Sequence, residues 1–164
     1  LSDRFDFPLH LGITEAGLIF DGAVKSAVGV GIMLYLGIGD TIRVSLTGDP
    51  VREVAAGHAI LSSLGLRTRG PVLISCPTCG RCDVDLEKIA ERVDKRLKDY
   101  RSSFKVAVMG CVVNGPGEAR EADFGIACGK GIGAVFAKGK EIRRVKENLL
   151  VDALFGVIDE NIDN

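Results

Sequence analysis

The sequence FKVAVMGCVVNGPGE, from Phe104 to Glu118, joins an apolar run to a glycine-rich segment and sets the architecture of the chain. Its first part, Phe104–Met109, carries the β-branched valines that are typical of a buried strand. Cys111 should therefore lie at the carboxyl end of that strand, where α/β proteins place their functional residues. Glycines on both sides of Pro116 favour a tight, rigid turn. This turn would present two reactive groups, the thiol of Cys111 and the carboxylate of Glu118.

The composition narrows the class of protein. A chain of 164 residues suits one domain, or one small domain with part of another. Its 21 basic and 22 acidic residues give a net charge of −1, so no basic field favours nucleic acid as a partner. The most apolar stretch, Ala27–Ile38, is shorter than the roughly 20 residues that span a membrane. Five cysteines without a secretory signal indicate metal or redox chemistry in a reducing compartment, and we expect the cytoplasm.

The first part of the chain alternates strand and helix patterns, which cover Leu9–Ile13, Asp21–Leu36, Thr41–Leu46 and Pro50–Leu64. Asp49 precedes the last of these as a typical helix cap. Such alternation predicts parallel strands joined by crossover helices. Two units cannot cover both faces of a sheet, and a complete eightfold barrel takes about 250 residues. We therefore expect residues 1–68 to be the truncated end of a larger domain.

The second part restarts after a polar, helix-terminating segment around Gly65–Pro71. It predicts a compact α/β unit over residues 69–164, with two hairpin strands around a glycine-rich turn and a closing helix. The expected strands are Pro71–Ser75, Phe104–Met109, Phe124–Cys128 and Gly133–Lys138, and the expected helices are Leu86–Tyr100 and Glu141–Val157.

The cysteine pattern indicates a metal site. Cys76 and Cys79 are separated by two residues, a spacing that lets both thiolates bind one metal centre, either zinc or iron. Cys111 and Glu118 are candidates for the remaining ligands. Structural zinc would favour another cysteine or a histidine, and the two histidines are poorly placed. Iron–sulfur clusters usually take four thiolates, so a carboxylate in the fourth place, being exchangeable, would indicate a catalytic cluster, while a small zinc module stays open as the alternative.

Several other polar or reactive residues can be interpreted either as part of a site or as ordinary structural residues. Cys82 is a weaker ligand candidate, because it lies at the approach to a helix, and Cys128 is expected to be a small apolar group in a strand. Arg43 and Ser45 lie two apart on a strand and project to one side, where they could bind phosphate or simply face solvent. Glu15, at the end of the preceding strand, would lie at the same mouth of a barrel.

Four segments together resemble the carboxyl-terminal part of the GcpE family of hydroxymethylbutenyl diphosphate synthases. They are PLHLGITEAG (Pro8–Gly17), GIGDTIRVSL (Gly37–Leu46), CPTCGR (Cys76–Arg81) and VAVMGCVVNGPGEA (Val106–Ala119). The resemblance covers nearly the whole chain, and the four segments follow one another in the same order as in the family. It implies an α/β protein in which residues 1–68 are the last two strand–helix units of a TIM barrel. Residues 69–164 would then form an iron–sulfur domain resembling the sulfite and nitrite reductase fold.

The resemblance also implies a site and a reaction. A 4Fe-4S cluster would be held by three cysteines and one glutamate, which are by position Cys76, Cys79, Cys111 and Glu118. Family members open the ring of methylerythritol cyclodiphosphate reductively in isoprenoid synthesis, with electrons from flavodoxin or ferredoxin, and Glu118 would yield to the substrate oxygen.

The substrate contacts implied by the resemblance lie in both parts of the chain. Arg43 and Ser45 would contact the diphosphate, Glu15 would face the substrate as a catalytic carboxylate, and Asn114 would add a further contact. Family members act as homodimers in which one subunit's cluster domain closes over the partner's barrel. Because about six of eight barrel units have no counterpart here, we expect this chain to bind a cluster without turning over substrate.

Overall fold

The computed structural model describes residues 1–15, 17–82, 84–111 and 115–162. The chain divides into two compact units, Leu1–Thr68 and Arg69–Asn164. Within the described residues, none of the helices combines the length and the apolar character needed to cross a membrane.

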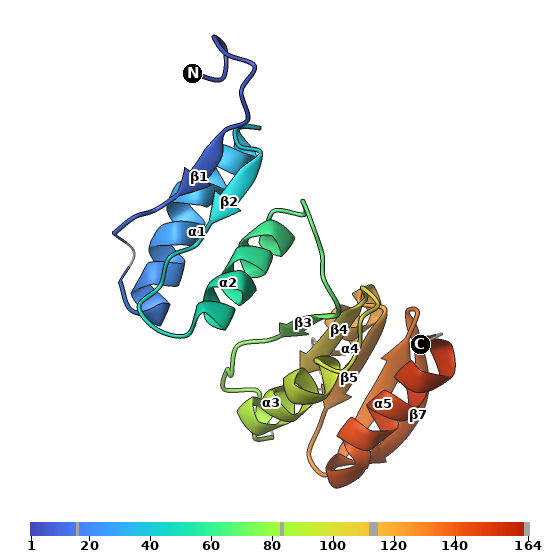
Figure 1. Ribbon diagram of the computed structural model, residues 1–164. Coiled ribbons are helices and arrows are strands. Elements are labelled where there is room, and N and C mark those ends of the chain that lie inside the picture. The colour runs from blue at the N-terminus through green and yellow to red at the C-terminus, as the bar shows by residue number, and fades with distance from the viewer. Residues whose placement is uncertain (16, 83, 112–114, 163–164) are drawn as a thin grey trace. The chain divides into compact units, whose positions relative to one another are not determined.

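The first unit is strand, helix, strand, helix, as the sequence predicts (Figure 1). Its elements are β1 (His10–Gly12), α1 (Ile19–Tyr35), β2 (Thr41–Arg43) and α2 (Pro50–Ser63). The strands β1 and β2 pair in parallel through the crossover helix α1. Asp49 caps α2 by accepting a hydrogen bond from the Val51 amide at 3.0 Å. Pro50 is the first residue of the helix, a position where proline costs nothing because an amide there would have no hydrogen-bond partner within the helix.

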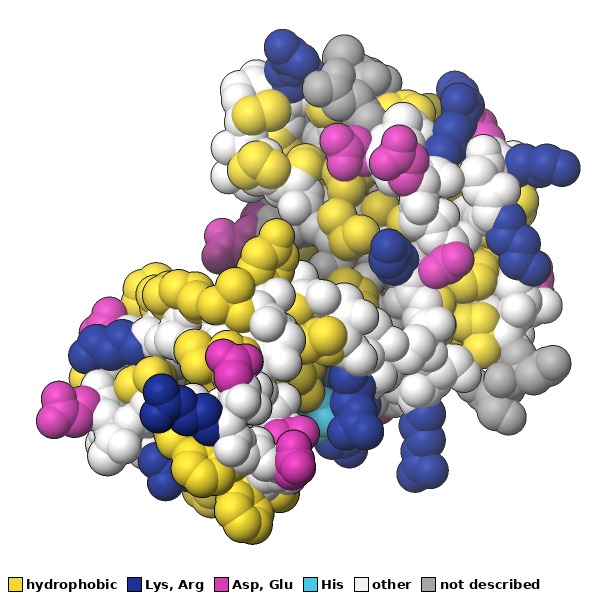
Figure 2. Space-filling model, turned by 90° about the horizontal axis from the view of Figure 1, so that it is seen from above, with side chains coloured by type: hydrophobic (Ala, Val, Ile, Leu, Met, Phe, Trp, Pro, Cys, Tyr) yellow, Lys and Arg dark blue, Asp and Glu magenta, His cyan; other side chains and the backbone are white. Residues whose placement is uncertain are grey.

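The first unit leaves much of its apolar surface uncovered. Val30, Val44 and Ile60 form a small core between the helices and the two strands. Eight large apolar residues in and beside α1 are instead exposed: Leu18, Ile19, Phe20, Val24, Val28, Ile32, Tyr35 and Leu36. Figure 2 shows apolar side chains reaching the surface in several places between scattered charged ones. Two strand–helix units thus supply too little structure to bury the apolar residues they carry.

The second unit is a five-stranded sheet with the strand order β3-β4-β5-β6-β7. The strands β3, β4 and β5 are parallel, whereas β6 and β7 complete the sheet as antiparallel hairpins. The strands are β3 (Val72–Ser75), β4 (Lys105–Met109), β5 (Phe124–Cys128), β6 (Ile132–Ala137) and β7 (Lys140–Lys146). The helices are α3 (Leu86–Leu97), α4 (Gly115–Glu121), a 3₁₀ turn at Glu147–Leu149 and α5 (Leu150–Asn161).

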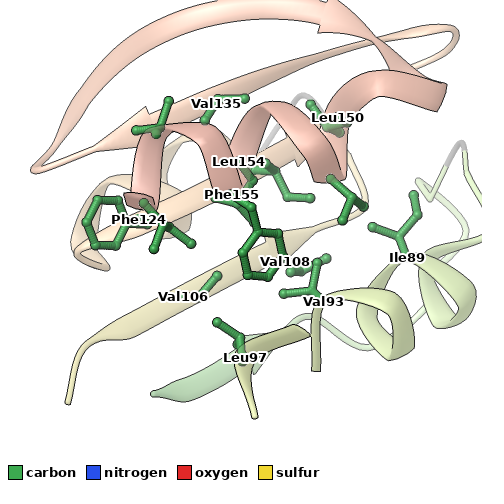
Figure 3. Close-up of a cluster of buried hydrophobic side chains, with 14 of the residues drawn as sticks. Ile89, Val93, Leu97, Val106, Val108, Phe124, Val135, Leu150, Leu154 and Phe155 are labelled. Carbon is green, nitrogen blue, oxygen red and sulfur yellow. The ribbon is translucent and has the colours of Figure 1, made fainter. Parts of the chain in front are cut away.

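Alternation along the central strand β4 assigns its side chains to the two faces of the sheet. Val106 and Val108 belong to the main core with α3 and α5, whereas Ala107 and Met109 belong to a smaller core with α4. Each fully buried aliphatic side chain contributes about 1.5–3 kcal/mol, so the main core holds the unit together. Figure 3 shows this core, with labelled members Ile89, Val93, Leu97, Val106, Val108, Phe124, Val135, Leu150, Leu154 and Phe155.

The predicted closing helix from Glu141 is wrong over its first part, because Lys140–Lys146 forms β7. A two-residue turn at Lys138 (φ 48°) and Gly139 (φ 79°) connects β6 to β7. Two successive positive φ values characterise the type I′ turn, which matches the twist of a hairpin. β7 is a charged, mostly exposed edge strand, as edge strands that avoid aggregation commonly are. The helix begins only at Leu150.

Candidate functional site

The site lies where β3 and β4 end. These neighbouring strands are parallel, with Ser75 opposite Val108, so the segments that follow them leave the sheet at the same edge. Cys76 follows β3 directly and Cys111 follows β4 after one glycine, Gly110. The Gly110 amide donates a hydrogen bond to the Cys76 sulfur over 3.3 Å. The strand register thereby brings together two thiols that are far apart in the sequence.

A cavity of about 300 Å³ opens at this edge, and four of the residues singled out in the sequence line it. They are Cys76, Cys79, Cys111 and Glu118. Their exposure is graded, because Cys111 is buried, Cys76 is half-buried, and Cys79 and Glu118 are exposed. The rest of the lining is mainly apolar, with one arginine: Ile74, Ser75, Pro77, Arg81, Met109 and Gly115.

Glu118 reaches the cavity from a helix and not from the rigid turn that the sequence predicts. Gly115–Glu121 forms α4, and Pro116 falls in its first turn, which tolerates proline. The helix is packed very close to the sheet. A Cβ added at Gly115 would lie 3.1 Å from the Cβ of Met109 and 3.2 Å from that of Ala127. The close approach of α4 to β4 and β5 therefore sets the position of Glu118.

The donor set has the chemistry of a cluster site. Three thiols and a carboxylate surround one cavity, and thiolates are the usual ligands of iron–sulfur clusters. Among the described residues, no three Cys, His, Asp or Glu side chains converge closely enough to hold a single metal ion. The four irons of a 4Fe-4S cluster each take their own protein ligand, so ligands of such a cluster stand further apart than those of one ion.

The two remaining cysteines differ from these in their surroundings. Cys82 is half-buried, and its thiol donates a hydrogen bond to the Val84 carbonyl at 3.2 Å. Cys128 is fully buried in the main core, as the sequence predicts for an apolar thiol. Burial is the main cause that raises the pKa of Cys128 to about 12, and negative charge from Glu147 acts in the same direction. Cys128 is therefore a neutral core residue at physiological pH.

In the first unit, one predicted site residue, Arg43, contacts the residue that precedes another, Glu15. Arg43 ends β2, and its guanidinium donates a long hydrogen bond of 3.5 Å to the Thr14 hydroxyl, next to Glu15. Arg43 and Glu15 are exposed and Ser45 is half-buried. Ser45 lies beyond β2, because the strand is shorter than the predicted Thr41–Leu46. The remaining predicted contact, Asn114, lies outside the described residues.

Arg81 is the charged one among the lining residues that the sequence did not point to. It brings a positive charge to a cavity that also contains a carboxylate and three thiols. The available signal was its position two residues after Cys79, because a residue so close in sequence to a pair of candidate ligands must also lie close to them in space.

Comparison with known proteins places the chain in a family. Residues 72–160 match the model of the GcpE protein C-terminal domain, and residues 1–58 match that of the GcpE TIM-barrel domain. Similar curated proteins are named 4-hydroxy-3-methylbut-2-en-1-yl diphosphate synthase (flavodoxin). The protein of Nitratidesulfovibrio vulgaris is 61% identical over 152 residues, covering 92% of this chain and 39% of the relative.

Two further relatives of the same name extend this result. The protein of Clostridium acetobutylicum is 60% identical over 97% of this chain and 46% of its own length. That of Aquifex aeolicus is 57% identical over 93% of this chain and 43% of its own length. The chain thus spans less than half the length of these relatives. With both parts matched by the family's own domain models, the chain belongs to the GcpE family.

Proposed function

We propose that this chain is the cluster-bearing part of a 4-hydroxy-3-methylbut-2-enyl diphosphate synthase. The whole protein would open the ring of 2-C-methyl-D-erythritol 2,4-cyclodiphosphate reductively and remove a hydroxyl group. The observation that carries the proposal is the single cavity lined by Cys76, Cys79, Cys111 and Glu118, in a chain of the GcpE family. These four residues would hold a 4Fe-4S cluster, in a domain that we propose resembles the sulfite and nitrite reductase fold.

The cluster would supply the site with electrons, one at a time, from a flavodoxin or ferredoxin. The residues around it have different roles. Cys111 is buried and Cys76 accepts a hydrogen bond from Gly110, so these two thiolates would form the fixed side of the site. Glu118 is exposed and is a hard oxygen ligand among soft sulfurs. It is therefore the group that can most readily give way to a substrate oxygen.

The substrate contacts that we propose lie in the first unit. A diphosphate carries several negative oxygens, and an arginine binds such groups through charge-assisted hydrogen bonds. Arg43 and Ser45 would take this role, Glu15 would face the reacting part of the substrate, and Asn114 would contribute from the segment before α4. Because the relatives are more than twice as long as this chain, we propose that turnover needs the whole protein, acting as a homodimer.

The test is anaerobic reconstitution of this chain with iron and sulfide, followed by metal analysis and electron paramagnetic resonance. We expect about four irons and four sulfides per chain, the content of the cluster type, and no synthase activity. A colourless protein with one zinc per chain would support the alternative, a small zinc-binding structural module. Robust turnover by this chain alone would contradict the need for the whole protein.

The role of Glu118 is tested separately in the full-length enzyme. Glu118→Cys should keep the cluster but slow ring opening, because a fourth thiolate leaves iron less readily than a carboxylate does. Glu121→Gln is the matched control, since Glu121 is also an exposed glutamate of α4 but does not line the cavity. Loss of the cluster in Glu118→Cys would make Glu118 chiefly a structural ligand.

A further inference from the structure

The backbone of Gly110 lies between two cysteine sulfurs. On one side its amide donates to the Cys76 sulfur at 3.3 Å. On the other side, the Cys82 sulfur would be only 2.6 Å from a Cβ added at Gly110, so it already contacts the glycine. The side chain of Leu86 closes the same side, at 3.1 Å from that position. Gly110 is therefore a glycine because Cys82 occupies the space that a side chain would need.

Cys82 is itself anchored at two points. Its thiol donates to the Val84 carbonyl at 3.2 Å, and its amide donates to the Cys79 carbonyl at 2.9 Å. The contact with Val84 directs the Cys82 sulfur to the main chain of its own segment. Cys82 is also not among the residues that line the cavity. Its surroundings suit a thiol held in place by the main chain and packed against Gly110, outside the cavity.

We propose that Cys82 is a positioning residue for the cluster and not one of its ligands. Its sulfur packs against Gly110 on the side opposite Cys76, so that the Gly110 amide stays directed at the Cys76 sulfur. Hydrogen bonds to ligand sulfurs help to set the reduction potential of a cluster. An amide that donates to the sulfur favours the reduced, more negative state and so raises the potential. This inference rests on the proposed function, because it assumes that Cys76 binds the cluster.

The first experiment compares the reconstituted wild-type chain with Cys82→Ala and Cys82→Ser. Iron and sulfide content should match the wild type in both variants. The reduction potential, measured by anaerobic titration with electron paramagnetic resonance, should fall in Cys82→Ala, because Gly110 loses its support. Cys82→Ser should recover most of the wild-type potential, since its hydroxyl can donate to the same Val84 carbonyl.

The second experiment exchanges the two groups in contact. Gly110→Ala alone should lose most of its iron, because the new methyl group overlaps the Cys82 sulfur. The double variant Cys82→Ala with Gly110→Ala should regain iron, because removal of the sulfur makes room for the methyl group. Circular dichroism of each cluster-free variant establishes whether it is folded. The Cys82→Ala result stands even if Gly110→Ala does not fold.

The outcomes separate this inference from the proposed function. A wild-type chain that takes up no cluster would refute the proposed function, and this inference with it. Wild-type uptake together with loss of iron and sulfide in Cys82→Ala would make Cys82 a ligand and overturn the inference. An unchanged potential in Cys82→Ala, at full iron content, would also overturn it, by showing that Cys82 only fills space.

Discussion

Replacing Gly125 with alanine should displace α4 and so test what positions Glu118. Gly125 is the second residue of β5, and an added Cβ would meet three atoms of Ala119 in α4 at 2.9–3.1 Å, two of them in the backbone. Overpacking of this kind costs about 1–3 kcal/mol. Because these neighbours cannot rotate away, we take the upper value of about 3 kcal/mol. Alanine loses less conformational entropy on folding than glycine does, which offsets about 1 kcal/mol of this cost. The net loss in the free energy of unfolding is then about 2 kcal/mol.

For a domain of this size, about 2 kcal/mol lowers the melting temperature by about 8–16 °C. Tyrosine fluorescence can follow the second unit, because Tyr100 packs there against Phe104 whereas Tyr35, in the first unit, is 83% exposed. Gly117→Ala is the matched control. Among the described residues, nothing beyond its own helix lies within 4 Å of a Cβ added there, so alanine should stabilise α4 by up to about 1 kcal/mol.

The reconstituted Gly125→Ala chain should also bind less iron than the wild type, because the displaced helix carries Glu118. A Gly125→Ala chain with the melting temperature and the iron content of the wild type would refute the view that close packing of α4 on β5 sets the position of Glu118.

Four further variants test other parts of the structure. Burial, with a hydrogen bond to Asp159, raises the pKa of Tyr100 to about 12 from an ordinary 10.0. The contribution of Tyr100 to the free energy of unfolding is therefore complete below about pH 10 and is lost as the pH rises towards about 12. Urea unfolding of the wild-type and Tyr100→Phe chains at these two pH values measures this loss. Cys128→Ser should lower stability to urea but keep the iron, whereas Cys79→Ser should lose iron, as metal analysis will show. Asp49→Ala removes a helix cap and should cost the first unit about 1 kcal/mol, measurable by circular dichroism as lower helix content on heating.

Much of the site could be predicted from the sequence because it depends on local patterns and one rule of topology. The valines of β4 and the alternating units indicated parallel strands. The sequence placed Cys76 and Cys111 each directly after an expected strand, and the structure brings them together because β3 and β4 are parallel neighbours whose carboxyl ends meet at one edge. The cap at Asp49 and the core position of Cys128 follow from equally local signals, and the structure confirms both.

The part of the fold that could not be predicted depends on pairing between distant residues. Ile142, Val145 and Leu149 have a spacing that fits a helix, yet the first two lie in β7. Hydrogen bonds to β6 outweigh this weak helical pattern. The available signal was Lys138-Gly139, where the glycine suits a tight hairpin turn although the lysine does not usually adopt positive φ.

The glycines around the site show why its chemistry is easier to predict than its geometry. The sequence suggested that glycines beside Pro116 supply unusual backbone angles, yet neither Gly115 nor Gly117 adopts a left-handed φ. At Gly115 the requirement is space, because the helix touches the sheet there. At Gly110 it is again space, taken up by the sulfur of Cys82. A glycine needed for close approach looks the same in a sequence as one needed for a turn, and only the packing partner, which is distant along the chain, distinguishes them.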